Sequence, residues 1–503
     1  MKMLKQLFYF FLIFSFYNIN AENNSGKIHY SVDLVNHNDD LFKVKITMDD
    51  YKLKNGTFNF PATAPGIYSN INFGRYVVDF KALDMHGKEL GVKKINTNQY
   101  KVDNPQNLKM IQYSIEDTYD FEPDTPKIAS MVGTALEDDF AILNTFGVLG
   151  YFEETQKLPI HLELKCEKDW SVGTSLKKIS KNIFYAENYD KLADSPILLG
   201  KISHSATKVN NIDVDLYVYT TEREFSAENL IPTIDTLLQT SSEFIGFSPV
   251  NNYTFLMCLI PDSIRIKKGQ LGGGALEHNQ SSLYYLPADK RELTLLKDVV
   301  LHEFLHILTP LNAHSELIHN FNFITPIPSK HLWFYEGVTE WGSTIAQLRS
   351  NYKTLQQYLQ KITDYLRVSE NFDNNYSLFD MSLESYTKKG NDAFINFYNR
   401  GAVTACLLDI RLLELSDGKK GLRELLIDIV KEYGQDKFFK DDEFFDIIVK
   451  KSFPEIKIFI DDYICGVKPL PLSEFFSKVG IKYISEVFHN SEIPSLGTNL
   501  GVN

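Results

Sequence analysis

The chain has 503 residues, of which 44% are hydrophobic and 23% are charged, and its formal net charge at pH 7 is −13. Nucleic-acid-binding domains present a basic face, so this acidic balance argues against a nucleic-acid partner. The length is too great for one hydrophobic core and predicts two or three domains.

Residues 1–21 are predicted to be a secretory signal peptide. Lys2 and Lys5 supply a positive end, LFYFFLIFSFY supplies an apolar run, and Ala21 is a small residue suited to cleavage. The run is shorter than the roughly 20 apolar residues that span a bilayer, although an uncleaved anchor is the alternative. We therefore expect a secreted or periplasmic protein with no transmembrane span after removal of the signal.

The next part of the chain, residues 22–205, is predicted to be an all-β sandwich. Apolar and polar residues alternate in KIHYSVDLV, FKVKITMDDY, YVVDFKALD, KMIQYSIED and IHLELKCEK. Asn, Asp, Gly and Pro separate these segments, as expected of turns between short strands. Such a domain would pack on a catalytic domain and wall one side of its cleft, with carbohydrate binding as the rival interpretation.

Residues 206–470 are predicted to form the catalytic domain, which begins with a mixed α/β lobe. VDLYVYT reads as a strand, a helix follows over Ala227 to Phe244, and YTFLMCLIP and SSLYYLP read as further strands. The glycine run 272–274 has no following GK[ST], so a nucleotide site is not expected. Gly273 and Gly274 are instead predicted to let the backbone approach a substrate closely.

His302, Glu303 and His306 form a His-Glu-x-x-His motif. Residues four apart lie on one face of a helix, so the two imidazoles can bind one metal ion. The motif can arise by chance, but it stands in the apolar helix TLLKDVVLHEFLHIL, where a charged glutamate is costly unless it serves a function. We expect Pro310 to end this helix.

The chemistry of such a motif predicts one zinc ion. Zn²⁺ accepts two neutral imidazoles and one carboxylate and leaves a fourth position for water, which it acidifies. Glu303 beside the metal would accept the proton of that water and later donate it to the leaving amine.

Glu336, in LWFYEGVTEW, is the best candidate for the third ligand. The alternative metzincin pattern fails because Thr309 and Asn312 stand where it needs glycine and histidine. His314 and His319 lie in a polar segment and are interpreted as solvated loop residues.

Glu340 follows Glu336 by one helical turn and is therefore predicted to lie on the same side of the second helix. A carboxylate in that place could accept the free N–H of a ligating histidine and fix its tautomer. A solvated surface position is the alternative for Glu340.

After Trp341 the chain is predicted to be mostly helical. Apolar residues recur at three- and four-residue steps in SNYKTLQQYLQKITDYLRV, NDAFINFYNRGAVTACLLDIRLLEL, LRELLIDIVKEY and FFDIIVKK. Residues 471–503 form a short tail. The predicted fold class is therefore multidomain α+β, with a β-sandwich before a catalytic domain of mixed and helical lobes.

HEFLH followed by LWFYEGVTEW resembles the paired motifs of the gluzincins, the thermolysin-like zinc metallopeptidases. Four further segments, PATAPGIY (61–68), YDKLADSPILLG (189–200), GGGALEH (272–278) and FYNRGAVTACLLDIRL (397–412), resemble the glycyl aminopeptidase family within them. The chain departs from the family at Ile307 to Thr309, after HExxH, and we expect no complete PDZ domain, which family members usually carry, in the short tail.

The resemblance implies a role for each matching residue. His302, His306 and Glu336 would bind zinc, and Glu303 would be the general base. Glu277 would hold the free amino terminus of a peptide, and Tyr398 would donate a hydrogen bond to the oxyanion. Small first residues such as glycine or alanine would be favoured.

The resulting hypothesis is an exported zinc aminopeptidase acting on peptides with a free amino terminus. One alternative is a zinc endopeptidase of the same fold, if Glu277 does not face the substrate amine. The other is a binding protein on a peptidase scaffold, against which the retention of a complete set of catalytic residues argues.

Overall fold

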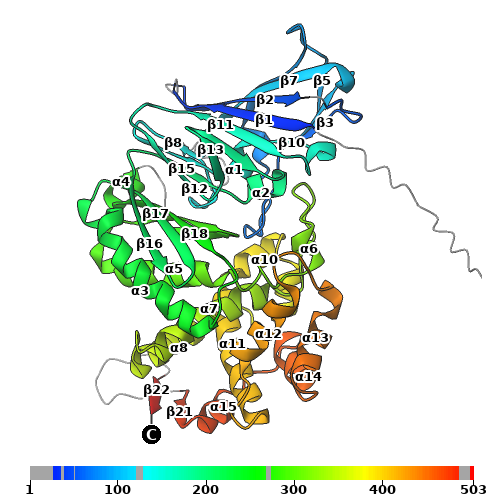
Figure 1. Cartoon of the computed structure of the whole chain (residues 1–503). Coiled ribbons are helices and arrows are strands. Elements are labelled where there is room, and N and C mark those ends of the chain that lie inside the picture. The colour runs from blue at the N-terminus through cyan, green and yellow to red at the C-terminus, as the bar shows by residue number, and fades with distance from the viewer. Residues whose placement is uncertain are drawn as a thin grey trace, which may run out of the picture.

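The computed structural model describes residues 26–35, 39–49, 51–119, 128–267, 273–485 and 499–502. The predicted signal peptide lies outside these residues. Three parts follow one another along the molecule: a β-rich N-terminal domain, a central sheet flanked by helices, and a helical lobe (Figure 1). This arrangement confirms the predicted fold class.

The largest sheet of the N-terminal domain has seven strands in the order β13-β14-β11-β1-β2-β7-β4. Its strands are β1 (Lys27–Asp33), β2 (Leu41–Asp49), β4 (Val77–Asp84), β7 (Leu108–Glu116), β11 (Ile160–Lys165), β13 (Lys177–Ser180) and β14 (Ile183–Ala186). The five strands predicted from alternation all begin within one residue of their expected positions. In β1 and β2 every second residue is buried, which is the pattern of a sheet with one face on a core.

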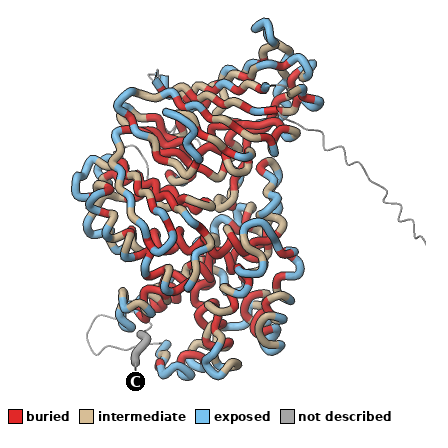
Figure 2. The backbone as a smooth tube through the Cα atoms, in the orientation of Figure 1, coloured by how far each residue is buried: buried red, intermediate tan, exposed pale blue. Residues whose placement is uncertain are grey.

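Two four-stranded sheets complete this domain, in the orders β10-β3-β6-β5 and β12-β15-β9-β8. Their strands are β3 (Thr57–Asn59), β5 (Val92–Asn96), β6 (Gln99–Val102), β8 (Ala135–Leu136), β9 (Phe140–Leu143), β10 (Tyr151–Phe152), β12 (Ser171–Thr174) and β15 (Ile197–Gly200). The short helices α1 (Thr145–Val148) and α2 (Tyr189–Ala193) lie among them. Buried residues from these sheets form one hydrophobic core, and Figure 2 shows the buried positions in red along the strands.

The central sheet has five strands in the order β16-β17-β18-β20-β19. They are β16 (Ser203–Val209), β17 (Ile212–Thr220), β18 (Asn252–Ile260), β19 (Gly274–His278) and β20 (Ser281–Pro287). β17, β18 and β20 run parallel, and β19 is an antiparallel strand at the edge. The helix α3 (Ala227–Ile245) connects β17 to β18 and ends at Gly246 in the left-handed conformation, whereas α4 (Asp262–Lys267) follows β18.

The motif helix α5 spans Leu293–Leu305 and ends five residues before Pro310, the residue that was expected to end it. The α-helix gives way to a tighter turn before the proline, because the backbone N–H groups of Ile307 and Leu308 donate to carbonyls three residues back, as in a 3-10 helix. His306 nevertheless keeps helical dihedral angles, with φ −59° and ψ −16°, so it stays on the face of the helix that carries His302.

The helical lobe contains every remaining long helix. Its elements are α6 (Glu316–His319), the π-helical turn η6 (Trp333–Val338), α7 (Thr339–Arg349), α8 (Leu355–Ser369), α9 (Leu378–Leu383), α10 (Lys388–Ala393), α11 (Asn396–Leu415), α12 (Leu422–Tyr433), α13 (Phe444–Lys451), α14 (Ile456–Phe459) and α15 (Leu472–Lys478). The strands β21 (Ile481–Ile484) and β22 (Asn499–Val502) close the chain. The predicted segments 422–433 and 444–451 coincide with α12 and α13.

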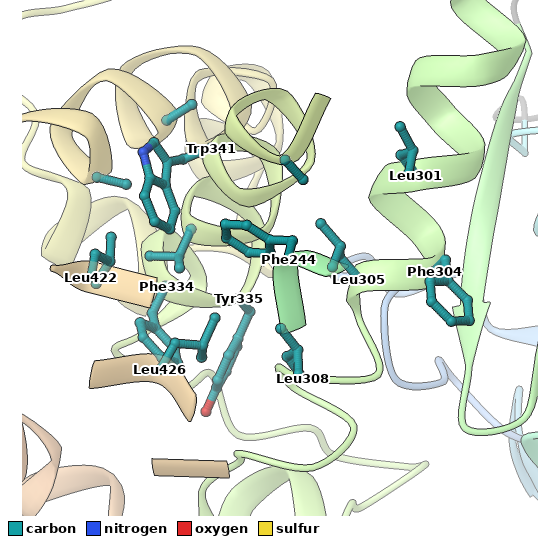
Figure 3. Packing of buried hydrophobic residues seen from close by; sticks show 14 of the residues in the cluster. Phe244, Leu301, Phe304, Leu305, Leu308, Phe334, Tyr335, Trp341, Leu422 and Leu426 are labelled. Carbon is teal, nitrogen blue, oxygen red and sulfur yellow. The ribbon is translucent and has the colours of Figure 1, made fainter. Parts of the chain in front are cut away.

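One apolar core joins the central and helical parts. Phe244 of α3 packs beside Leu305 of α5 and Trp341 of α7, with Leu422 and Leu426 of α12 nearby (Figure 3). This packing fixes α5, which carries His302, against α7, which continues directly from the turn η6 that carries Glu336. Among the described residues no helix is both long and apolar enough to cross a bilayer.

Candidate metal centre and peptidase site

The two motif histidines lie side by side in the interior. His302 is 5% exposed and His306 is 1% exposed, and their ring centroids are 4.7 Å apart. His306 Nδ1 lies 2.9 Å from the carbonyl oxygen of Thr309, which can only accept a hydrogen bond. The Nδ1 atom of His306 therefore carries the proton, and its Nε2 atom presents a lone pair.

His302 is oriented in the same way by a carboxylate. Its Nδ1 atom lies 2.7 Å from Glu340 Oε2, and its Nε2 atom faces the Nε2 atom of His306 at 3.1 Å. Burial lowers the pKa of His306 to about 4. Burial acts in the same sense on His302, but the nearby carboxylates of Glu336 and Glu340 outweigh it and raise the pKa of that imidazole. Two carboxylates, those of Glu336 and Glu340, therefore face His302 from its two ring nitrogens.

Glu336 completes a triangle of donor atoms. Its Oε2 atom lies 3.5 Å from His302 Nε2 and 3.7 Å from His306 Nε2. Tetrahedral coordination at ligand distances of about 2.1 Å places neighbouring donor atoms roughly 3.4 Å apart. The same oxygen is buried without a hydrogen-bond partner among the described residues. The three side chains thus fit a zinc-sized ion.

The π-helical turn η6 brings Glu336 to this position. Gly337, the next residue, lies against Gly401 of α11, where an added Cβ would come within 2.8 Å of the Gly401 Cα atom. Only glycine permits this close crossing of η6 and α11. Because α11 also carries Tyr398, the crossing fixes the tyrosine relative to Glu336.

Glu303 follows His302 on α5 and is 7% exposed. Burial, reinforced by the Glu336 and Glu340 carboxylates and opposed by His302, raises the pKa of Glu303 to about 8. Its Oε2 atom is buried without a hydrogen-bond partner in the described part of the chain. A free carboxylate oxygen beside the donor triangle is placed to take a proton from a bound reactant.

Glu277 reaches the same place from the edge strand β19. Donor atoms of Glu277, Glu303 and His306 all lie within 4.8 Å of one another. Burial, together with the negative charges of Glu336 and Glu303, raises the pKa of Glu277. A buried carboxylate of this kind is stabilised by a cationic partner such as a substrate ammonium.

Tyr398 lies beside His302 and Glu336. Its ring centroid is 5.3 Å from that of His302, and its hydroxyl interacts with the Glu336 carboxylate. Burial and the charges of Glu336 and Glu303 raise the pKa of Tyr398, so the hydroxyl keeps its proton and can donate it in a hydrogen bond.

Sequence comparison agrees with this geometry. Residues 29–201 match the Peptidase M61 N-terminal domain, and residues 296–404 match the M61 glycyl aminopeptidase domain. The chain belongs to the M61 glycyl aminopeptidase family. The family is one of peptidases, and the matched ranges contain His302, Glu303, His306, Glu336 and Tyr398.

Solved structures resemble the M61 chain in fold. An aminopeptidase N family protein from Idiomarina loihiensis matches with a TM-score of 0.80 at 21% identity, covering 92% of this chain and 79% of that one. Native leukotriene A4 hydrolase from Saccharomyces cerevisiae matches at 0.51 and 14% identity, covering 87% and 65%. The yeast enzyme in complex with bestatin matches at 0.52 and 14% identity, covering 88% and 68%. No match was found among curated proteins.

Of the remaining predicted residues of the M61 chain, Glu340 lies at this centre, whereas the nearest neighbours of Gly273 and Gly274 are Tyr285, Arg265 and Met131. Glu340 accepts from His302 and also from the Tyr365 hydroxyl, and Lys361 lies 3.9 Å from it. It is therefore not a solvated surface residue. Gly274 begins β19, where an added Cβ would come within 2.9 Å of Met131, and Gly273 precedes it on the exposed side.

The prediction that His314 is solvated is wrong. It is 5% exposed, its Nδ1 atom lies 2.8 Å from the carbonyl of Pro310, and its Nε2 atom lies 3.2 Å from His319. The chain around His314 forms a turn that is followed by the short helix α6. The hydrogen-bond partner of His314 in this turn is the backbone carbonyl of Pro310. His319 is exposed, and neither histidine joins the donor triangle.

Sequence reasoning missed two tyrosines of the M61 chain. Tyr365 of α8 supports Glu340, and Tyr68 of the N-terminal domain reaches the catalytic core. The segment PATAPGIY carried a usable signal for Tyr68, since proline and glycine mark a tight turn that presents the next aromatic residue. No comparable signal precedes Tyr365, which stands in a regular helix.

Proposed function

We propose that this M61 chain is a zinc-dependent aminopeptidase that removes small first residues, such as glycine or alanine, from peptides. The observation that carries the proposal is the convergence of Glu277, Glu303 and His306 within 4.8 Å. A carboxylate suited to a free amine thus lies beside the general base and the metal ligands. An endopeptidase needs the base and the metal ligands but has no use for this third group.

His302, His306 and Glu336 would hold the zinc ion. When bound, Zn²⁺ supplies Lewis acidity that polarises the scissile carbonyl and makes water a nucleophile at neutral pH. Glu340 and the Thr309 carbonyl keep both imidazoles in the tautomer that presents Nε2 to the ion.

The reaction then uses three further side chains. Glu303 takes a proton from the attacking water and returns it to the leaving amine. Tyr398 donates a hydrogen bond to the oxygen of the carbonyl as negative charge develops there. Glu277 pairs with the substrate ammonium and so fixes the scissile bond one residue from the chain end.

The test combines a zinc assay with cleavage of glycyl, alanyl and leucyl substrates and of an amino-acetylated peptide. Wild type should contain one zinc ion per chain and cleave the free-terminus substrates. Glu303→Gln should keep the zinc and lose about 10²-fold or more of kcat, since a proton-transfer group supplies roughly that factor. Glu292→Gln, an exposed residue at the start of the same helix, is the matched control.

Three outcomes would contradict the proposal. Retained activity in Glu303→Gln would refute the assigned base. Efficient interior cleavage of the acetylated peptide would favour an endopeptidase. Full zinc loading without turnover of any peptide would favour a binding protein.

We also propose that the protein is exported. The positive end, apolar run and small residue of positions 1–21 support this assignment. Mass spectrometry of the amino terminus after cell fractionation tests it: a mature chain that begins near residue 22 outside the cytoplasm is expected. An intact Met1 in the cytoplasm would contradict it.

A further inference from the structure

A segment of the N-terminal domain, Pro61–Tyr68, enters the catalytic site. Its first part is tied to the chain beyond the motif helix, because the carbonyl of Phe323 accepts from the backbone N–H groups of Ala62, at 2.7 Å, and Thr63, at 3.4 Å. Ala64 still packs in the N-terminal core, whereas Tyr68 packs in the catalytic core. The segment therefore crosses from one domain into the other within five residues.

Gly66 lies directly against the carboxylate of Glu277. An added Cβ at Gly66 would lie 2.9 Å from each Glu277 carboxylate oxygen, and the φ of this glycine is +83°. Both the space and the backbone conformation require glycine here. The backbone of the segment thus closes the site on the side of Glu277.

Tyr68 is anchored firmly in an unfavourable backbone conformation. Its φ is +49°, in the left-handed region that residues with a Cβ atom rarely adopt. Its carbonyl accepts from Asn391 Nδ2 at 3.2 Å, and its side chain is buried at 4% exposure. These contacts hold Tyr68 in a backbone conformation that would be unfavourable without them.

The ring of Tyr68 faces the groups assigned to the substrate. The ring centroid of Tyr68 is 5.5 Å from that of Phe394, and the ring centroid of Phe394 is 5.6 Å from that of Tyr398. Besides burial, the charges of Glu336 and Glu277 raise the pKa of Tyr68, so the hydroxyl stays neutral. No described residue forms a hydrogen bond with that hydroxyl.

In a peptide, the terminal amine and the scissile carbonyl are both attached to the Cα atom of the first residue. The Tyr68 segment adjoins the residues assigned to both groups, since Gly66 lies against the Glu277 carboxylate and Phe394 connects the ring of Tyr68 to that of Tyr398. A side chain near both residues can contact the Cα atom that joins the amine to the carbonyl, and the side chain on that Cα atom. We propose that Tyr68 forms the wall of the pocket for the first side chain and restricts it to small residues. This inference rests on the proposed aminopeptidase function.

The experiment compares kcat/KM for leucyl and glycyl anilides in wild type, Tyr68→Ala, Tyr68→Leu and Tyr68→Phe. Partial unfolding of a variant lowers the measured kcat/KM for both anilides by the same factor. The ratio of the leucyl to the glycyl value is therefore unaffected by the fraction of folded enzyme. Tyr68→Ala should raise the leucyl-to-glycyl ratio about tenfold or more, because pocket size discriminates by such factors. Tyr68→Leu should raise it less, and Tyr68→Phe should leave it near the wild-type value.

Tyr100→Ala is the matched control, since Tyr100 is a buried tyrosine of the same domain that packs on Phe80. An unchanged ratio in an active Tyr68→Ala enzyme, or an equal change in Tyr100→Ala, would overturn the assignment. A wild-type enzyme that cleaves no free-terminus substrate would instead refute the proposed function, which separates the two failures.

Discussion

His302 is held between two carboxylates, one at each ring nitrogen. Glu340 lies 2.7 Å from Nδ1, and Glu336 lies 3.5 Å from Nε2. Burial would raise the pKa of Glu340, but hydrogen bonding with His302 and the charges of His302 and Lys361 lower it to about 2. Glu340 thus stays ionised, and its direct contact with the candidate metal ligands is the hydrogen bond with His302.

This arrangement gives a prediction for Glu340→Gln. The amide can still accept from His302, but without the charge the imidazole becomes a weaker ligand. We expect zinc affinity to fall about 10–100-fold, which is the usual effect of losing the partner of a ligating histidine. Competition with a zinc chelator measures it, and Glu370→Gln, an exposed change at the end of α8, is the control. Unchanged affinity in Glu340→Gln would contradict the assigned role.

Asp409 of α11 gives a prediction about pH. Its Oδ1 atom accepts from the N–H of Leu422 at 2.6 Å. Burial, opposed by that hydrogen bond and reinforced by Glu424, raises the pKa of Asp409 from 3.8 to about 6. Between pH 3.8 and about 6, Asp409 therefore keeps its proton in the folded state but has lost it in the unfolded state. Stability from this group is present below pH 4 and is lost as the pH rises through 6.

Asp409→Asn should remove this dependence, because the amide is neutral throughout. We expect the variant to be more stable than wild type at pH 7 by about 1–2 kcal/mol, a value reduced for partial exposure, and equally stable near pH 4. Urea unfolding across this range measures it. The control is Asp446→Asn, because Asp446 is an exposed aspartate on α13. The stability difference between this variant and wild type should not depend on pH. A constant difference at every pH would contradict the prediction.

The sequence predicted the residues of the site whose spacing is local. His302, Glu303 and His306 depend on one helix, and Glu336 and Glu340 depend on the next, so chain position alone indicated where they belong. Tyr68 could not be found in this way because its place depends on packing between two domains. His314 was misread because its partner is a backbone carbonyl, which no side-chain pattern reveals.

At the level of elements, the crossing of η6 and α11 sets the geometry of the site. An added Cβ at Gly337 would come within 2.7 Å of the Gly401 carbonyl carbon, whereas one at Gly401 would come within 3.1 Å of the Gly337 Cα atom. Backbone cannot move aside as a flexible side chain can. Any side chain here must therefore push the helix of Glu336 away from the helix of Tyr398.

Gly337→Ala should accordingly lower both the melting temperature and kcat/KM, and Gly401→Ala should do so less severely. The matched control is Gly342→Ala on α7, where the added Cβ would meet only side chains, at 3.6 and 3.8 Å. That change should be neutral or stabilise the protein by up to about 1 kcal/mol, as alanine does in a helix. Thermal unfolding and anilide kinetics measure these effects. Equal behaviour of all three variants would contradict the argument.

Helices and strands whose apolar residues recur at a regular spacing could be predicted from the sequence, and elements without such a spacing could not. The alternating strands and the helices α12 and α13 follow directly from their apolar spacing. Strands such as β8 and β10 have two residues each and show no period at all. The π-helical turn η6 was read as ordinary helix, because one wide turn barely alters the apolar pattern.

For the whole molecule, the two domains exchange core residues. Tyr68 of the N-terminal domain belongs to the catalytic core, while Leu276 and Phe323 of the catalytic domain belong to the N-terminal core. The ring centroid of Phe323 lies 5.5 Å from that of Tyr189 and 6.0 Å from that of Tyr151. Neither core is complete without the other domain.

The exchange predicts that both domains unfold in one transition. Phe323→Ala should destabilise that transition by about 3–5 kcal/mol, the usual cost of deleting a buried phenylalanine. Near-ultraviolet circular dichroism and loss of activity should report the same midpoint. Phe438→Ala, at a phenylalanine that is 37% exposed, should change it little. Two separate midpoints, with only one shifted by Phe323→Ala, would show that the domains unfold independently.

The exchange also has a consequence for the order in which the chain acquires its structure during synthesis. The last strand of the N-terminal domain ends at Gly200, but Phe323, which fills part of its core, emerges from the ribosome much later. The N-terminal domain is therefore unable to complete its packing as soon as its own residues have been made, as an independent domain can. It must remain loosely packed until the segment beyond the motif helix has been translated.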